Sequence, residues 1–124
     1  MIYKELSYQI VGIAFDVYNN LGPGYQEKYY QRGFAFGLQE KNWKFRREVL
    51  VPITFKGRDI GRYYLDFLVE DKIIVELKKG DYFSRKNIEQ VIAYLQATDL
   101  QLAILINFTS TGVKFKRILN SNSK

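Results

Sequence analysis

Two carboxylates and one lysine near the middle of the chain have types and spacing that suit a site in which the carboxylates bind a hard cation. Asp66 lies on one expected strand, and Glu76 and Lys78 lie on the next. Side chains alternate between the two faces of a strand, so a hairpin centred on Asp71 places Asp66 directly opposite Glu76. Mg²⁺ prefers oxygen ligands and commonly takes one or two carboxylates together with water and phosphate oxygens.

The apolar residues of the same two strands favour this pairing. In this register Val69 faces Ile73 and Phe67 faces Val75. A shift by one residue would move the apolar residues of the two strands to opposite faces of the hairpin. The side chains expected to face the core together are Leu65, Phe67, Val69, Ile73, Val75 and Leu77.

Two carboxylates that lie directly opposite each other repel. The cost is ~0.2–1 kcal/mol on a solvated strand and larger on a covered one. Lys78, on the same face as Glu76, could offset the repulsion, and so could a divalent ion. The alternative is an ordinary surface ion-pair patch, because charged residues are common on the open face of a strand. Against it, the same face carries Tyr64, Leu68 and Ile74, so we expect the face to be partly covered.

The composition leaves carboxylate and lysine side chains as the main candidates for chemistry. The chain has 124 residues and contains no cysteine and no histidine. Zinc sites that need thiolate or imidazole ligands are therefore excluded, as is catalysis by Ser-His-Asp or Cys-His groups. The net charge of +6 and the pI of about 9.5 favour a polyanionic partner.

The hydrophobic pattern around these residues predicts an α/β fold. The expected helices are 4–21, ended by Gly22 and Pro23, then about 24–39, and a third with Ser84 as N-cap and an apolar stripe of Ile88, Val91, Ile92 and Leu95. The expected strands are 49–55, 60–69, 73–78, 101–107 and 113–118. The strand–helix–strand step suggests a parallel crossover, and hence a mixed β-sheet flanked by helices.

The length argues for one domain over residues 1–119, followed by a disordered tail at 120–124. The N-terminal residues lack the apolar core of a signal peptide. The longest apolar stretch, 102–106, is too short to cross a bilayer. We therefore expect a soluble, cytoplasmic protein with no membrane partner.

Three motifs resemble those of a known superfamily. Asp66, followed by Glu76-Leu77-Lys78 and a helix, resembles the signature of the PD-(D/E)XK nucleases. Residues 24–30, GYQEKYY, resemble the motif that names the GxxExxY proteins, a branch of small proteins within that superfamily. Gln90 and Tyr94 resemble the Q-xxx-Y helix motif of its recombination-helicase branch. The resemblance extends over nearly the whole chain and implies a restriction-endonuclease-like core.

The resemblance also implies roles for single residues. It implies catalytic roles for Asp66, Glu76, Lys78 and Glu27, metal binding by Asp66, Glu76 and Glu27, and substrate binding by Gln90, Tyr94 and Tyr30. The implied cofactor is Mg²⁺ or Mn²⁺. Lys79 stands where the family commonly has a small residue, which adds a positive charge beside the site.

The implied activity is metal-dependent hydrolysis of phosphodiester bonds, with DNA as the expected substrate, in repair, recombination or defence. Because Lys78 is expected beside two carboxylates, we expect it to position water and stabilise charge rather than act as a base. Basic residues concentrate between Lys41 and Arg62 and again from Lys114 onward. These segments could follow a DNA backbone.

Other interpretations stay open. A catalytically silent nucleic-acid-binding module could carry the same motifs, and the aromatic content of 16% suggests a protein-interaction domain, for example a homodimer. Glu27 could simply be an acidic residue that favours the first turn of a helix. Tyr30 and Tyr94 could be amphipathic aromatic residues, and Gln90 a solvated helix residue.

Overall fold

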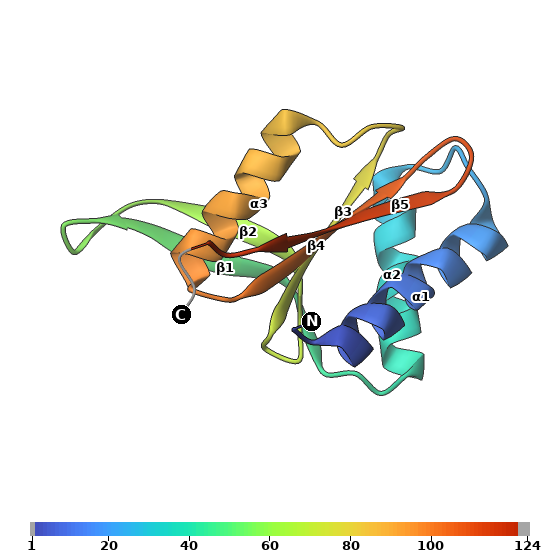
Figure 1. The fold of residues 1–124 in the computed structure, drawn as a ribbon, viewed down its shortest axis with the longest axis horizontal. Coiled ribbons are helices and arrows are strands. Elements are labelled where there is room, and N and C mark those ends of the chain that lie inside the picture. The colour runs from blue at the N-terminus through green and yellow to red at the C-terminus, as the bar shows by residue number, and fades with distance from the viewer. Residues whose placement is uncertain (1, 122–124) are drawn as a thin grey trace.

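The computed structural model describes residues 2–121, which form a five-stranded mixed sheet with helices on both faces (Figure 1). The elements are α1 (Lys4–Leu21), α2 (Glu27–Glu40), β1 (Phe45–Phe55), β2 (Arg58–Val69), β3 (Ile73–Lys79), α3 (Arg85–Thr98), β4 (Leu102–Phe108) and β5 (Val113–Leu119). The strand order is β1-β2-β3-β4-β5. Strands β3 and β4 are parallel and the other neighbours are antiparallel, so the predicted crossover through α3 is confirmed.

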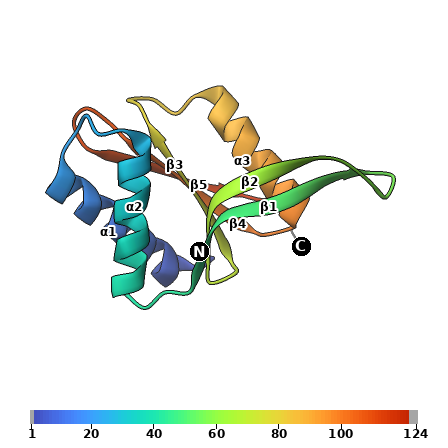
Figure 2. The ribbon, with the colours of Figure 1, turned by 180° about the vertical axis from the view of Figure 1, so that it is seen from behind.

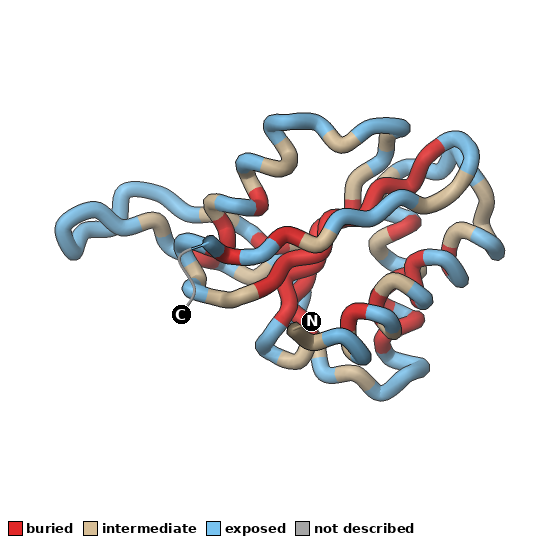
Figure 3. Tube along the Cα trace, viewed as in Figure 1, coloured by how far each residue is buried: buried red, intermediate tan, exposed pale blue. Residues whose placement is uncertain are grey.

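The sheet separates two apolar cores. Helices α1 and α2 cover one face and α3 covers the other, as the two opposite views show (Figures 1 and 2). Every residue of β4 is buried, because alternate side chains enter the two cores. The buried part of the chain accordingly follows the centre of the sheet (Figure 3). Such strands, buried on both faces, have continuous apolar sequences.

The predicted register of the β2–β3 hairpin is confirmed, since Val69 pairs with Ile73 and Phe67 with Val75. The prediction that Leu65 shares a core with Phe67 is wrong. Leu65 lies in the core beneath α3, whereas Phe67 lies in the core beneath α1 and α2. The regular alternation is interrupted at Glu48 of β1, which has a φ of 50° where the strand passes Asp66.

Two further expectations need correction, and a third is confirmed. Helix α2 begins at Glu27 rather than near Gly24, because Gly24 has a φ of 91° and belongs to a loop. On α3 Val91 and Leu95 are buried as expected, but the third buried side chain is Tyr94, while Ile92 is 38% exposed. Ser84 is the N-cap as expected, and its Oγ accepts a hydrogen bond of 3.0 Å from the N–H of Asn87.

The end of the chain is ordered beyond the expected boundary at residue 119. Asn120 is buried, and its Nδ2 donates hydrogen bonds of 3.0 Å to the carbonyl oxygens of Leu95 and Leu100. Asn120 therefore belongs to the packed fold and not to a tail. The disorder expected for 122–124 falls outside the described residues. Within residues 2–121, no helix combines the length and the apolar character that crossing a membrane requires.

Candidate active site

Asp66 and Glu76 lie where β2 and β3 separate. The paired residues of the two strands end at Phe67 and Val75, one position before these carboxylates. Glu76 Oε2 accepts a hydrogen bond of 2.7 Å from the N–H of Asp66, and Asp66 Oδ2 accepts one of 3.0 Å from the N–H of Leu77. Each carboxylate thus satisfies a backbone N–H across the opening, which leaves its second oxygen available.

Burial dominates the electrostatics of this pair. Glu76 is only 1% exposed, and its burial together with the nearby charge of Asp66 raises its pKa to about 8. Burial also raises the pKa of Asp66, while the N–H of Leu77 and the charge of Lys78 oppose that rise. Within residues 2–121 neither carboxylate forms an ion pair. Nearby positive charge therefore acts on the pair without direct ion-pair contact.

Glu27 contributes a third negative charge from a different element. It is the first residue of α2, where the positive end of the helix dipole favours an acidic side chain. Its charge acts on both Asp66 and Glu76 and raises the pKa of each. Even so, no three acidic side chains of residues 2–121 are grouped closely enough to hold one ion. Glu27 therefore faces the site without completing a three-carboxylate cluster.

The residues present nevertheless fit a divalent ion. Two buried carboxylates that repel each other, each with one oxygen outside the hydrogen bonds described above, form a donor set for a hard cation. Mg²⁺ in particular takes one or two carboxylates and completes its coordination with water and phosphate oxygens. Asp66 and Glu76 are the residues that would hold it.

Lys78 stands two residues beyond Glu76 on β3 and is half-buried. Its positive charge lowers the pKa of both carboxylates, so its ammonium group acts on the site. Its register partner on β4 is the buried Asn107, whose Nδ2 donates to the carbonyl oxygens of Gly80 and Tyr82. Asn107 thus holds the loop that follows β3.

Helix α3 brings Tyr94 to the same place. Its side chain is 4% exposed and packs edge-on against Tyr63 of β2 at a ring distance of 5.0 Å. Burial and the charges of Glu76 and Asp66 raise the pKa of this phenol, which therefore stays protonated and able to donate a hydrogen bond. Gln90 lies one turn earlier on α3 and is half-buried. A role for Gln90 stays a prediction.

Tyr30 is buried, and the expectation that it binds substrate stays a prediction. It is 1% exposed, and its ring stacks on Phe108 at 4.3 Å. Its hydroxyl donates a hydrogen bond of 2.7 Å to the carbonyl oxygen of Gly22. Tyr30 therefore fixes the loop that leads to Glu27, so its contribution to the site is through position.

Arg47 also acts on the site, although it belongs to none of the sequence motifs. Its guanidinium lies 5.2 Å from the centre of the Phe67 ring, and its charge lowers the pKa of Asp66. Arg47 comes close to Asp66 because it pairs across the sheet with Phe67, the neighbour of Asp66. That pairing depends on the β1–β2 register, which the sequence pattern did not specify.

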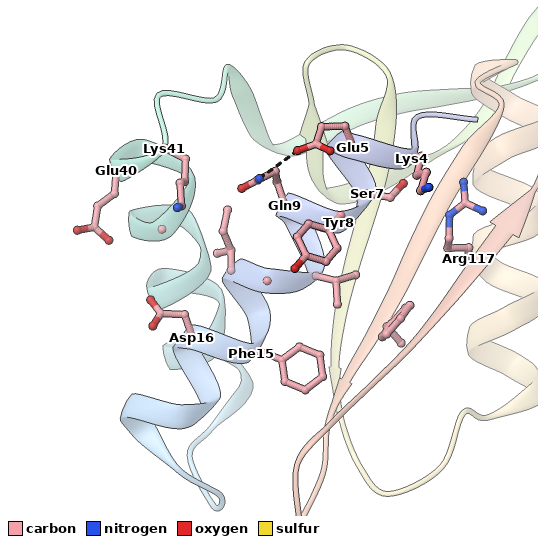
Figure 4. A pocket seen from close by; sticks show the side chains of 15 residues that line it. Lys4, Glu5, Ser7, Tyr8, Gln9, Phe15, Asp16, Glu40, Lys41 and Arg117 are labelled. Carbon is pink, nitrogen blue, oxygen red and sulfur yellow. Dashed lines mark hydrogen bonds between the residues drawn. The ribbon is translucent and has the colours of Figure 1, made fainter. Parts of the chain in front are cut away.

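The wide groove around α1 is separate from these residues (Figure 4). It has a volume of about 1240 Å³ and extends from α1 to Glu40 and Lys41 on one side and to Phe115 and Arg117 on the other. None of the candidate site residues lines it. The candidate chemistry therefore lies at the opening between β2 and β3 and not in this groove.

The fold and the paired carboxylates define a nuclease-like α/β domain, and the comparisons agree. A family profile described as the PD-(D/E)XK nuclease superfamily matches residues 4–118. The chain belongs to this superfamily, and its fold is restriction-endonuclease-like. No curated protein matches the chain.

Two solved structures share the fold. The crystal structure of SSO0001 superposes with a TM-score of 0.52 at 21% identity, over 95% of this chain and 57% of that one. This chain thus spans little more than half the length of SSO0001. An alkaline exonuclease, LHK-Exo from Laribacter hongkongensis, superposes with a TM-score of 0.53 at 12% identity, over 94% of this chain and 83% of that one. At these identities the likeness concerns the fold.

Proposed function

We propose that this protein is a Mg²⁺- or Mn²⁺-dependent nuclease that hydrolyses phosphodiester bonds of DNA. The observation that carries the proposal is the buried pair of Asp66 and Glu76 at the opening between β2 and β3. A structural role alone explains the pair poorly, because burying two like charges without an ion-pair partner is unfavourable. Membership of the PD-(D/E)XK nuclease superfamily supports the same conclusion.

In this proposal Asp66 and Glu76 hold the ion, and Glu27 adds a third negative charge near it from the start of α2. A bound divalent ion supplies a water of lowered pKa and neutralises charge on the phosphate. Lys78 positions the attacking water and stabilises the negative charge that develops on the phosphate oxygens. Tyr94 donates a hydrogen bond to the substrate from α3, and Gln90 contacts the strand that is cut.

The test is cleavage of linear and supercoiled DNA in Mg²⁺ or Mn²⁺. Glu76→Gln and Lys78→Met should each lower the rate by about 100-fold or more, because each removes a charge that acts on the reacting phosphate. Glu89→Gln is the matched control, since Glu89 is an exposed acid on α3 that pairs with Arg85. Cleavage that persists unchanged in Glu76→Gln would contradict the proposal.

A second candidate is a catalytically silent nucleic-acid-binding module. It is favoured by the lack of a three-carboxylate group within residues 2–121. Salt-dependent DNA binding without turnover in any divalent ion would identify it. The nuclease is the better-supported function, because a binding module gains nothing from a buried carboxylate pair.

We also propose that the chain belongs to the GxxExxY branch of the superfamily. Support comes from the way the motif residues act together. Gly24 takes a φ of 91° in the loop before α2, Glu27 begins the helix, and Tyr30 fastens the loop through Gly22. The motif thus serves to place one carboxylate at the site.

The homodimer suggested by the aromatic content is a further proposal, and the groove around α1 supports it. Tyr8, Phe15 and Phe115 are exposed there by 74%, 40% and 45%. The lining also carries both signs of charge, which suits a two-fold interface in which the same patch meets itself. Sedimentation should then show a dimer that Tyr8→Ser weakens, and a monomer at all concentrations would exclude it.

A further inference from the structure

The end of the β1–β2 hairpin stands apart from the rest of the molecule (Figures 1 and 2). All residues from 54 to 62 are exposed, which we call the hairpin tip. A two-stranded hairpin with no covered face gains little stability in water. The tip therefore contributes little to the fold, and its length needs another explanation.

The tip carries more positive than negative charge. Lys56, Arg58 and Arg62 lie on it, against one acid, Asp59. Among residues 2–121, none of these three cations forms an ion pair. Unpaired cations on an exposed ribbon are complementary to a polyanion.

The turn places one of these cations at the apex. Lys56 and Gly57 have φ angles of 50° and 80°, the signs of a tight two-residue hairpin turn that favours asparagine or glycine at both positions. A lysine in this conformation costs about 1 kcal/mol relative to glycine. Its Nζ lies 5.3 Å from the centre of the exposed Phe55 ring. The turn thus presents a defined shape with a cation and an aromatic ring at its end.

We propose that the hairpin tip enters the major groove of double-stranded DNA and that its cations bind the flanking phosphates. This inference rests on the proposed nuclease function and adds the substrate class, duplex rather than single-stranded DNA. The major groove is about 12 Å wide and admits a two-stranded β-ribbon. Phe55 and Ile60, exposed by 59% and 65%, supply apolar contacts for thymine methyl groups.

The tip and the active site share one continuous strand. Arg58 and Asp66 both lie on β2, and at ~3.3 Å per residue they are ~26 Å apart. Tyr63, between them, packs on Tyr94 and fixes the base of the hairpin to the site. A duplex that runs along β2 from the tip would be cut about eight base pairs from the place where it is gripped.

The experiment measures binding of a 30-bp duplex and of the matching single strand in buffer without divalent ions. Arg58→Ala/Arg62→Ala should weaken duplex binding by about tenfold or more. The plot of log association constant against log salt concentration should become less steep by about 1.8, because two phosphate contacts are lost. Lys72→Ala/Lys86→Ala removes the same charge from exposed positions elsewhere and should change duplex binding far less. Lys56→Asn keeps the turn conformation, which favours asparagine, and removes only the positive charge at the apex. A change in its DNA affinity therefore measures the effect of that charge and not of the turn's shape.

Several results would overturn the inference. One is equal weakening by the two double variants, which would mean that only net charge matters. Another is equal loss for single strand and duplex, which would assign the tip to stacking on unpaired bases. If Arg58→Ala/Arg62→Ala kept its DNA affinity but changed the oligomeric state of the protein, the tip would be assigned to a protein partner. Absence of duplex binding by the wild type would exclude the proposed role altogether.

This experiment distinguishes the inference from the nuclease proposal. Duplex binding through the tip without cleavage in Mg²⁺ would refute the nuclease function alone. Cleavage at wild-type rate by Arg58→Ala/Arg62→Ala would refute the role of the tip alone. In a cleaving protein, rates should also fall when fewer than about eight base pairs remain on the tip side of the cut.

Discussion

Asp66 and Glu76 each bond to the strand of the other: Glu76 accepts from the N–H of Asp66, and Asp66 accepts from the N–H of Leu77. Two side-chain bonds thus stand where the backbone pairing of β2 and β3 has ended. This arrangement explains how the fold tolerates two neighbouring buried carboxylates, because each one satisfies a backbone donor that would otherwise lack a partner.

The first prediction concerns pH and stability. The pKa of Glu76 is about 8 in the folded protein, against 4.5 for an unperturbed glutamate, so the folded state binds more protons between these values. The free energy of unfolding of the metal-free protein should therefore fall as pH rises from 5 to 8. Chemical denaturation at several pH values measures this slope.

Glu76→Gln should flatten that slope and raise stability at pH 8, because the amide is neutral and its oxygen can still accept from Asp66. The raised pKa of Asp66 leaves a smaller slope of the same sign. Glu89→Gln, which changes an exposed acid, should follow the wild type. A slope that is the same in wild type and Glu76→Gln would show that Glu76 is not the group responsible.

The second prediction concerns metal binding. A divalent ion that binds the folded state adds stability by mass action, and it needs ionised carboxylates. Mg²⁺ or Mn²⁺ should therefore raise the melting temperature more at pH 8 than at pH 5. Asp66→Asn should abolish the increase. An equal increase in Asp66→Asn would place the ion elsewhere on the chain.

The hairpin at the site was predictable because its pattern is local. Alternation in β2 and β3 fixed which residues pair, and the pair of Asp66 and Glu76 followed from it. The extent of α1 was equally clear, because Gly22 ends a regular helical pattern. In both cases the hydrophobic pattern lies within a short segment, and the residues that it predicts to be buried mostly pack as predicted.

The rest depended on long-range geometry. Leu65 lies in the core beneath α3, beside the point where Glu48 of the neighbouring strand takes a left-handed conformation, which no alternation rule reveals. Tyr30 shares a helix with Glu27, yet its packing on Phe108 of β4 directs it into the core. The effect of Arg47 on Asp66 likewise required the β1–β2 register.

The third prediction concerns the hydroxyl of Tyr94. Its raised pKa keeps it protonated, so it serves as a hydrogen-bond donor beside the carboxylates. Tyr94→Phe keeps the ring packed on Tyr63 but removes that donor. Cleavage should slow by roughly tenfold, the effect of one lost hydrogen bond, with the melting temperature nearly unchanged. A large loss of stability with normal kcat would instead assign the hydroxyl to the fold.

The fourth prediction separates position from contact at Tyr30. Tyr30→Phe removes the hydrogen bond to Gly22 and should cost about 1 kcal/mol of unfolding free energy. If Tyr30 acts only by placing Glu27, Tyr30→Phe should lower the cleavage rate by no more than Glu27→Gln does. The double variant should then cleave as fast as Glu27→Gln alone. Tyr29→Phe, at an exposed neighbour, is the control. Additive losses in the double variant would show instead that Tyr30 contributes to the reaction independently of Glu27.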